Sequence, residues 1–261
     1  MTKVRIAAQL HPQHADYSDI RGAAARAEAM GFDVVYNWDH FFPLYGDPDG
    51  KHFECWTMLG AWAEQTSTIE IGALVTCNSY RNPELLADMA RTVDHISGGR
   101  LVFGIGSGWF EKDYDEYGYE FGTAGSRLDD LKEALPRIER RWAALNPAPT
   151  RKIPVLIGGA GEQKTLRLVA RHADYWHLFA RNAEYLAHKI AVMRMRCDEI
   201  GRDPGEILIS AGIPRSAIVE SVDRADAYYG LGVREFTFGF DGPDYDLEQA
   251  KGWLQWRDSK K

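Results

Sequence analysis

Residues 83–106, PELLADMARTVDHISGGRLVFGIG, contain a helical pattern followed directly by a strand-like run. Pro83 suits the first turn of a helix, where a backbone N–H is not needed. Apolar residues then recur at the three- and four-residue spacing of one helix face: Leu86, Met89, Ala90 and Val93. Gly98 and Gly99 end this pattern, and the apolar run Leu101–Gly106 is typical of a parallel strand buried on both faces.

The same alternation recurs along the whole chain and predicts eight strands. These are Val4–Leu10, Asp33–Trp38, Ile69–Val75, Leu101–Gly106, Pro154–Gly158, Asp174–Phe179, Ile207–Ile213 and Glu235–Phe240. Eight strand–helix units favour a closed (β/α)8 barrel, an α/β fold of the TIM type, over an open doubly wound sheet. An open sheet that binds nucleotides usually has a glycine-rich turn after strand one, and here that turn is His11-Pro12-Gln13-His14.

The helices between these strands carry start and stop signals. Ser18 is expected to cap the first helix and Gly31 to end it. Pro136 is expected to kink or interrupt the longest helix. Further helices are predicted at Gly125–Leu145, Glu162–His172, Ala183–Ile200, Ser221–Tyr229 and Asp244–Trp256.

Composition limits the classes of function. The length of 261 residues suits one barrel, so a single domain over residues 1–261 is predicted. The net charge of −7 argues against nucleic-acid binding, and no apolar run is long enough to span a membrane. The chain begins without a signal-peptide pattern, and Cys55, Cys77 and Cys197 are too widely spaced to suggest disulfides or a zinc knuckle. We expect a reduced, cytoplasmic protein.

Catalytic groups of such barrels gather where the strands end at the C-terminal face. The second strand is followed by Asp39 and His40. An acid and an imidazole at this place can hold a protonatable ring or exchange a proton with a bound reactant. Alternatively, Asp39 caps a helix and His40 bonds to the backbone. The residue types alone leave both interpretations open.

Two glycine-rich turns follow the fourth and fifth strands. The first is Gly104-Ile105-Gly106-Ser107-Gly108-Trp109, which either lets a ligand approach the backbone or allows a bend at a crowded barrel corner. The second is Gly158-Gly159-Ala160-Gly161-Glu162, which is predicted to run straight into a helix and favours a phosphate site at the N-terminus of that helix. A short turn that uses glycine only for its conformational freedom is the alternative for the second.

Other polar residues at the predicted mouth have less specific interpretations. Arg81 could clamp a carboxylate or phosphate, or pair with a surface acid. Cys77 is interpreted as a small, partly buried side chain. The mouth also carries residues that bind zinc in barrel hydrolases: His11, His14, His40, His52, His177 and Asp241. No metal is expected, because the first strand lacks a His-x-His pair and the turns after strands four and five carry glycines.

These segments together resemble the bacterial luciferase-like flavin and deazaflavin oxidoreductases. The residues that carry the resemblance are Trp38–Phe41, Thr92–Leu101 with Gly108-Trp109, and Pro154–Gly159. The middle span is the most specific, and the similarity covers nearly the whole chain. Within the class, the chain is most similar to the branch that uses coenzyme F420, a deazaflavin. The segment Trp142–Ile153 is shorter than in many members.

The resemblance implies roles for individual residues. Asp39 and His40 would border the deazaflavin ring, with His40 as the catalytic residue that hydrogen-bonds or moves a proton. A non-proline cis peptide at Ala73–Leu74, followed by Thr76, would back the ring. Two turns would hold the ribityl-phosphate tail: Gly106, Ser107, Gly108 and Trp109, and Gly159, Ala160 and Gly161. Gln9 and His11 would face the substrate.

The sequence thus predicts an F420-dependent oxidoreductase that moves a hydride between deazaflavin C5 and a small organic substrate. An FMN-dependent monooxygenase of the same fold is the nearest alternative. A flavin- or deazaflavin-binding barrel without turnover and a metal hydrolase are the others. The resemblance further implies a homodimer and a flavin or F420 reductase as a partner.

Overall fold

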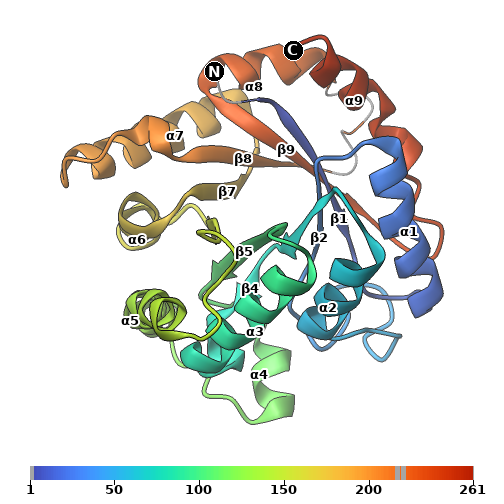
Figure 1. The fold of residues 1–261 in the computed structure, drawn as a ribbon. Coiled ribbons are helices and arrows are strands. Elements are labelled where there is room, and N and C mark those ends of the chain that lie inside the picture. Colours follow the sequence, from blue (N-terminus) through green and yellow to red (C-terminus); the bar gives the residue numbers. More distant parts are fainter. Residues whose placement is uncertain (1–2, 215–217, 219–221, 261) are drawn as a thin grey trace.

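The computed structural model describes residues 3–214, 218 and 222–260 and confirms the predicted (β/α)8 barrel (Figure 1). Its strands are β1 (Arg5–Leu10), β2 (Val34–Asn37), β3 (Glu70–Ala73), β4 (Thr76–Cys77), β5 (Leu101–Gly106), β6 (Val155–Gly158), β7 (Tyr175–Phe179), β8 (Leu208–Ile213) and β9 (Val233–Phe240). All pair in parallel, in the order β3-β2-β1-β9-β8-β7-β6-β5-β4, and β3 also pairs with β5 and closes the barrel. β3 lies within the predicted third strand Ile69–Val75, and β4 begins directly after its predicted end.

The helices surround the barrel, as Figure 1 shows. They are α1 (Tyr17–Met30), α2 (Cys55–Gln65), α3 (Pro83–Ile96), α4 (Glu111–Tyr117), α5 (Ala124–Ala144), α6 (Thr165–His172), α7 (Ala183–Asp198), α8 (Ala225–Leu231) and α9 (Lys251–Asp258). Short 3-10 turns cover Asn78–Tyr80, Pro204–Glu206, Val222–Arg224 and Leu247–Ala250. Within the described ranges, no helix combines the length and the apolar character that crossing a bilayer requires.

The helix boundaries correct several predictions. Asp16, not Ser18, is the N-cap residue of α1, and its N–H donates to Asp19 Oδ2 in the first turn at 3.0 Å. Pro136 lies inside a continuous α5 and does not interrupt it. The helix predicted from Ser221 begins at Ala225, and Ser221 lies outside the described residues. The helices α2 and α4 were not predicted.

The third strand is interrupted, and the cis peptide lies one residue further along than predicted. The cis bond joins Leu74 and Val75, not Ala73 and Leu74. Regular pairing with β2 continues through Ala73, and the Leu74 N–H still donates to the Asn37 carbonyl at 2.8 Å. The irregular backbone therefore begins only after Leu74.

Consecutive Leu74 and Val75 both pack inside the barrel, in a small cluster with Ala7, Val34, Tyr36, Val102 and Leu156. The two-residue alternation of a regular strand is lost here. Thr76 consequently faces outward, where its Oγ1 accepts a hydrogen bond of 3.1 Å from Trp56 Nε1 of α2. The side chain predicted to contact the cofactor is fully buried in the helix layer.

Glycines opposite this interruption make room for it. A Cβ atom built on Gly106 would lie 2.8 Å from Val75 Cγ2, and one on Gly158 would lie 3.1 Å from Val75 Cγ1. At Gly104 the Cβ would lie 1.9 Å from the Ala73 carbonyl oxygen. Gly104 and Gly106 are thus required by the crowded barrel corner, which was the alternative interpretation of this turn.

Gly104→Ala is therefore expected to destabilise the barrel by roughly 3 kcal/mol or more, because backbone atoms cannot move aside as a side chain can. Chemical denaturation monitored by circular dichroism measures the change. Gly60→Ala is the matched control. Gly60 lies in α2, and a Cβ added there would have no neighbour within 4 Å, so this change is expected to stabilise by about 0.5–1 kcal/mol. Equal effects at the two positions would contradict the explanation.

Candidate active site at the C-terminal mouth

His40, just after β2, is held by a buried carboxylate. Its Nδ1 lies 2.7 Å from Asp113 Oδ2. Asp113 is fully buried in α4 and also accepts from the Phe41 N–H at 3.1 Å and the Tyr80 hydroxyl at 2.8 Å. Three donors suit an acceptor-only carboxylate, so Nδ1 of His40 carries a proton and Nε2 is left for a ligand.

Asp39 is turned away from His40 and is used to anchor the neighbouring loop. Arg81 donates to both of its oxygens, at 2.6 and 3.0 Å, and the Cys77 N–H donates to Oδ2 at 3.0 Å. The Arg81 guanidinium also pairs with Glu54, which caps α2. Arg81 is therefore neither free to bind an anion nor exposed on the surface. Asp39 holds the loop after β4 in place through Arg81 and the Cys77 N–H.

Aromatic rings surround His40, and the ring of Trp109 is open to solvent. Its ring centroid lies 5.7 Å from that of Trp109 and 5.5 Å from that of Phe110, both edge to face, and 6.1 Å from that of Trp38. Trp109 is 62% exposed, and Phe179 at the end of β7 is 71% exposed. Large exposed rings at the mouth of a barrel are typical of a ligand site.

His11, predicted to face the substrate, forms a polar cluster at the end of β1. Its Nδ1 lies 2.6 Å from Asp241 Oδ1 and 2.7 Å from the Tyr45 hydroxyl, which also donates to Asp241. The imidazole stacks on Trp38 with 4.2 Å between centroids. It lies against Gly239, where a Cβ would come within 2.6 Å of Nε2. His11 thus connects β1, β2 and β9 beside His40.

Gln9 reaches across the barrel interior. Its Nε2 donates to the Leu74 carbonyl at 2.7 Å, directly before the cis bond. Gln9 therefore ties β1 to the interrupted third strand and helps to fix the backbone that was predicted to back the ring at Ala73 and Leu74. Its predicted contact with substrate stays a prediction.

The turn after β5 packs mainly against other side chains of the protein, which leaves little of it exposed to a ligand. A Cβ on Gly108 would lie 2.0 Å from the Tyr114 hydroxyl and 2.6 Å from Cys77 Sγ, and the φ angle of Gly108 is +80°. The Gly108 carbonyl accepts from Arg127 at 3.2 Å. Ser107 is half-buried, and its carbonyl is 3.4 Å from the Tyr114 hydroxyl. Of this turn, Trp109 is the residue exposed to a ligand.

The turn after β6 has a different character. Gly159 adopts a φ of +120°, and its N–H donates to the His177 carbonyl at 3.0 Å. One further turn separates it from α6, so the glycines do not adjoin the helix directly. In the part of the chain that the structure describes, four successive backbone N–H groups have no hydrogen-bond partner: those of Ala160, Gly161, Glu162 and Gln163. Such a row of free N–H groups suits a phosphate.

The cysteine at the mouth is not poised for nucleophilic chemistry. Cys77 is 4% exposed, and burial raises the pKa of its thiol to about 11. Its Sγ lies 3.2 Å from the Tyr114 hydroxyl. A thiol that stays protonated near neutral pH is a poor nucleophile, so the structure agrees with a packing role.

Two histidines of the mouth are held neutral by burial. The pKa of His52 is lowered from 6.5 to about 4, and His52 accepts a hydrogen bond of 3.0 Å from Trp38 Nε1. The pKa of His177 is likewise lowered to about 4 by burial. As the pH falls below 6.5, the unfolded chain therefore binds protons that these two folded-state histidines do not bind until about pH 4.

Acid is accordingly expected to destabilise the protein within this window. The two histidines together should lower the free energy of unfolding by about 3 kcal/mol between pH 7 and pH 5, a loss that denaturant titrations at each pH measure. His177→Gln should remove about half of this pH dependence. His95→Gln, at an exposed position of α3, should leave it unchanged. An unaltered pH dependence in His177→Gln would contradict the assignment.

The histidines and acids of the mouth are thus engaged with the protein. Within the described residues, no group of three or more histidine, cysteine, aspartate or glutamate side chains is arranged to hold a metal ion. Sequence reasoning missed the partnership of His40 with Asp113, which lies 73 residues further along the chain. The signal for it is slight, because the sequence presents Asp113 only as one of several acids near the mouth.

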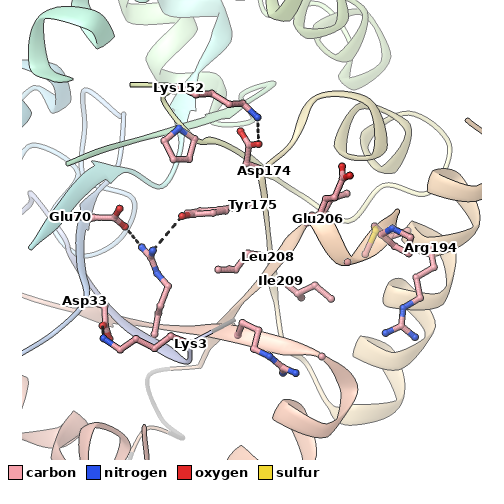
Figure 2. A pocket seen from close by; sticks show the side chains of 18 residues that line it. Lys3, Asp33, Glu70, Lys152, Asp174, Tyr175, Arg194, Glu206, Leu208 and Ile209 are labelled. Atoms are coloured by element: carbon pink, nitrogen blue, oxygen red, sulfur yellow. Dashed lines mark hydrogen bonds and ion pairs between the residues drawn. The ribbon is translucent and has the colours of Figure 1, made fainter. Parts of the chain in front are cut away.

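A pocket of ≈980 Å³ lies at the opposite, N-terminal end of the barrel. Figure 2 shows two of its ion pairs, Lys3 with Asp33 and Lys152 with Asp174. Arg5, which also lines the pocket, pairs with Glu70 and donates to the Tyr175 hydroxyl. Since chemistry in such barrels takes place at the C-terminal ends of the strands, these ion pairs are interpreted as supporting the fold.

Comparisons with known proteins agree with the fold and with the resemblance. The family model described as luciferase-like monooxygenase matches residues 1–260. An uncharacterized protein of Mycobacterium tuberculosis is 27% identical and aligns over 89% of this chain and 90% of its own. An F420-dependent glucose-6-phosphate dehydrogenase of Microbacterium testaceum is 31% identical over 57% of this chain and 48% of its own.

Among solved structures, an F420-dependent secondary alcohol dehydrogenase in complex with an F420-acetone adduct superposes with a TM-score of 0.83. The superposition covers 95% of this chain and 96% of that one. The sequence identity is 19%, so this similarity shows the fold alone.

Proposed function

The chain belongs to the luciferase-like monooxygenase family and is an oxidoreductase of that class, and from this premise we propose that it uses coenzyme F420. In this proposal a hydride passes between deazaflavin C5 and a small organic substrate. The observation that carries the proposal is the His40–Asp113 pair beside the exposed ring of Trp109. The F420-dependent relatives named above support the choice of cofactor.

The residues present fit such a cofactor. A flat ring system requires apolar walls, which Trp38 and Trp109 supply next to His40. A phosphate-bearing tail requires donors, which the free N–H groups of residues 160–163 supply in the part of the chain that is described. When bound, the deazaflavin supplies the hydride acceptor or donor.

The protein's own part is positioning and proton transfer. Asp113 fixes the His40 ring with Nε2 towards the mouth, where it hydrogen-bonds or moves a proton beside the cofactor. Gln9 and the backbone around Leu74 form one side of the site. The exposed ring of Phe179 supplies an apolar contact for substrate.

Turnover with small secondary alcohols tests this proposal, a substrate class suggested by the dehydrogenase of the same fold. Purified protein is mixed with oxidised F420 and each alcohol, and loss of the oxidised-deazaflavin absorbance is followed. The reverse reaction uses reduced F420 and the matching ketones. Reduction of F420 is expected with at least one alcohol. Oxygen consumption with reduced FMN, and no reaction with F420, would instead identify the monooxygenase alternative.

A further inference from the structure

A chain of buried polar side chains crosses the barrel interior below the mouth. His177 Nδ1 lies 2.9 Å from Ser210 Oγ, and Ser210 Oγ lies 2.9 Å from Glu235 Oε1. Glu235 also accepts from the Tyr36 hydroxyl at 3.2 Å and from Arg5 Nε at 3.0 Å. Ser210 and Glu235 are completely buried. Three neighbouring strands, β7, β8 and β9, supply the chain.

The contacts indicate where each proton resides. Arg5 and the Tyr36 hydroxyl both donate to Glu235, which suits its acceptor-only, ionised form. The single hydroxyl proton of Ser210 is then directed at Glu235 Oε1, at 2.9 Å, because the other neighbouring oxygen, Thr237 Oγ1, lies further away at 3.4 Å. Ser210 can only accept from His177, so Nδ1 of His177 carries the proton and Nε2 carries a lone pair.

The Nε2 atom of His177 is open to a ligand. Within the described ranges this nitrogen atom has no hydrogen-bond partner. It is also not completely buried, so a ligand can reach it. Phe179, next on the same face of β7, meets the His177 ring edge to face and is exposed at the mouth. Gly212 of β8 leaves room for both rings, since a Cβ there would lie 2.9 Å from Phe179 and 3.1 Å from Nε2.

The strand order places this group across the barrel from His40. β7 is four strands from β2 in either direction around the closed sheet. A ligand in the mouth therefore has His40 on one side and His177 with Phe179 on the other. Two imidazoles with Nε2 available thus face the same space from opposite walls.

We propose that His177 takes the proton of a substrate hydroxyl at Nε2 and passes its Nδ1 proton through Ser210 to Glu235. The inference rests on the proposed function and names its substrate as an alcohol, or a carbonyl compound in reverse. In this step His177 is the base, and His40 hydrogen-bonds to the reactants from the opposite wall. Ser210 and Glu235 are positioning residues that carry the proton onward.

The step balances in atoms and electrons. The O–H bond of the alcohol breaks and its proton joins Nε2, while the carbinol C–H bond breaks and its hydrogen leaves as hydride to the oxidised deazaflavin. A C=O bond forms in the product. The Nδ1 proton moves to Ser210 Oγ, the hydroxyl proton moves to Glu235, and a neutral glutamic acid results. Reduction of a ketone reverses each transfer.

The surroundings of His177, Ser210 and Glu235 suit a proton relay better than a mechanism in which His177 alone keeps the proton. Burial lowers the pKa of His177 to about 4, so the ring cannot hold a second proton near neutral pH. A relay avoids this, because one proton leaves Nδ1 as another arrives at Nε2 and the imidazole stays neutral. Burial also raises the pKa of Glu235, against the opposing effect of Arg5, which makes its carboxylate a better proton acceptor. Arg5 and Tyr36 lie around Glu235, and Arg5 in turn contacts Glu70 and Tyr175.

The protonation of His177 tests the relay without cofactor or substrate. ¹⁵N NMR of ring-labelled free protein, assigned by loss of the signals in His177→Gln, is expected to show the Nδ1–H tautomer at pH 7. Ser210→Ala should abolish the preference of His177 for the Nδ1–H tautomer. Ser210→Thr, which keeps a hydroxyl, should retain it. An Nε2–H tautomer in the unaltered protein would overturn the proposal, because Nε2 could not then accept a proton.

Turnover provides the second test. With the alcohol that the unaltered protein oxidises, Ser210→Ala is expected to lower kcat at least tenfold with unchanged affinity for F420, and Ser210→Thr should restore most of it. Ser97→Ala removes another buried hydroxyl, at the end of α3, and should leave kcat unchanged. Equal kcat in Ser210→Ala and the unaltered protein would overturn the relay. Failure to bind F420 would overturn the proposed function instead, and the NMR result would still decide the protonation of His177.

Discussion

His40→Ala is expected to lower turnover with F420 and its alcohol substrate by about 10²- to 10⁴-fold, the usual contribution of a positioned acid or base. The change removes the imidazole that Asp113 orients, while the surrounding rings of Trp38, Trp109 and Phe110 remain. Steady-state kinetics and a cofactor titration separate the effect on kcat from that on binding.

Asp113→Asn should reproduce part of this loss. An asparagine cannot accept simultaneously from His40, the Phe41 N–H and the Tyr80 hydroxyl, so the orientation of His40 is lost. His95→Gln, on the outer surface of α3, is the control and should retain full activity. Unchanged turnover together with unchanged cofactor affinity in His40→Ala would remove this residue from its proposed role.

Asp39→Ala is expected to lower the free energy of unfolding by about 3–5 kcal/mol, because it removes the buried carboxylate that accepts two hydrogen bonds from Arg81 and leaves the guanidinium with Glu54 alone. The Asp39 side chain is completely buried and Arg81 is 10% exposed. Removal of the carboxylate also leaves the Cys77 N–H without an acceptor. Denaturant titration monitored by circular dichroism measures the loss.

The matched control is Asp129→Ala, which breaks an ion pair with Lys164 at side chains that are 58% and 44% exposed. Screened by solvent, this pair should contribute less than about 1 kcal/mol. If the two aspartate replacements cost the same, the buried Asp39–Arg81 pair does not anchor the loop as described.

The barrel could be predicted because its signal is local. Buried parallel strands are short, continuous apolar runs, and β5 has the predicted bounds Leu101–Gly106. Helix α3 begins at Pro83 as predicted, because proline at the first turn is a local signal. The short helix α4, rich in charged and aromatic residues, lacks an extended apolar face and was not predicted.

The site could be predicted only in part, because its contacts are distant in sequence. Nothing near His40 indicates Asp113, and nothing near Asp39 indicates Arg81. Thr76 was predicted to contact the cofactor because it directly follows the predicted third strand, but the interruption at Val75 turns its side chain towards Trp56 of α2. Gly106 is required by packing against Val75, which was the alternative interpretation of this turn, and its predicted contact with the cofactor stays a prediction.

The central claim is that the mouth of this barrel holds a deazaflavin. Equilibrium titration of the purified protein with F420 and with FMN, each oxidised and reduced, tests this most directly. F420 is expected to bind with a Kd below roughly 100 μM, a binding free energy more favourable than about −5.5 kcal/mol, and more tightly than FMN. Binding of FMN alone, or of neither cofactor below this concentration, would contradict the account.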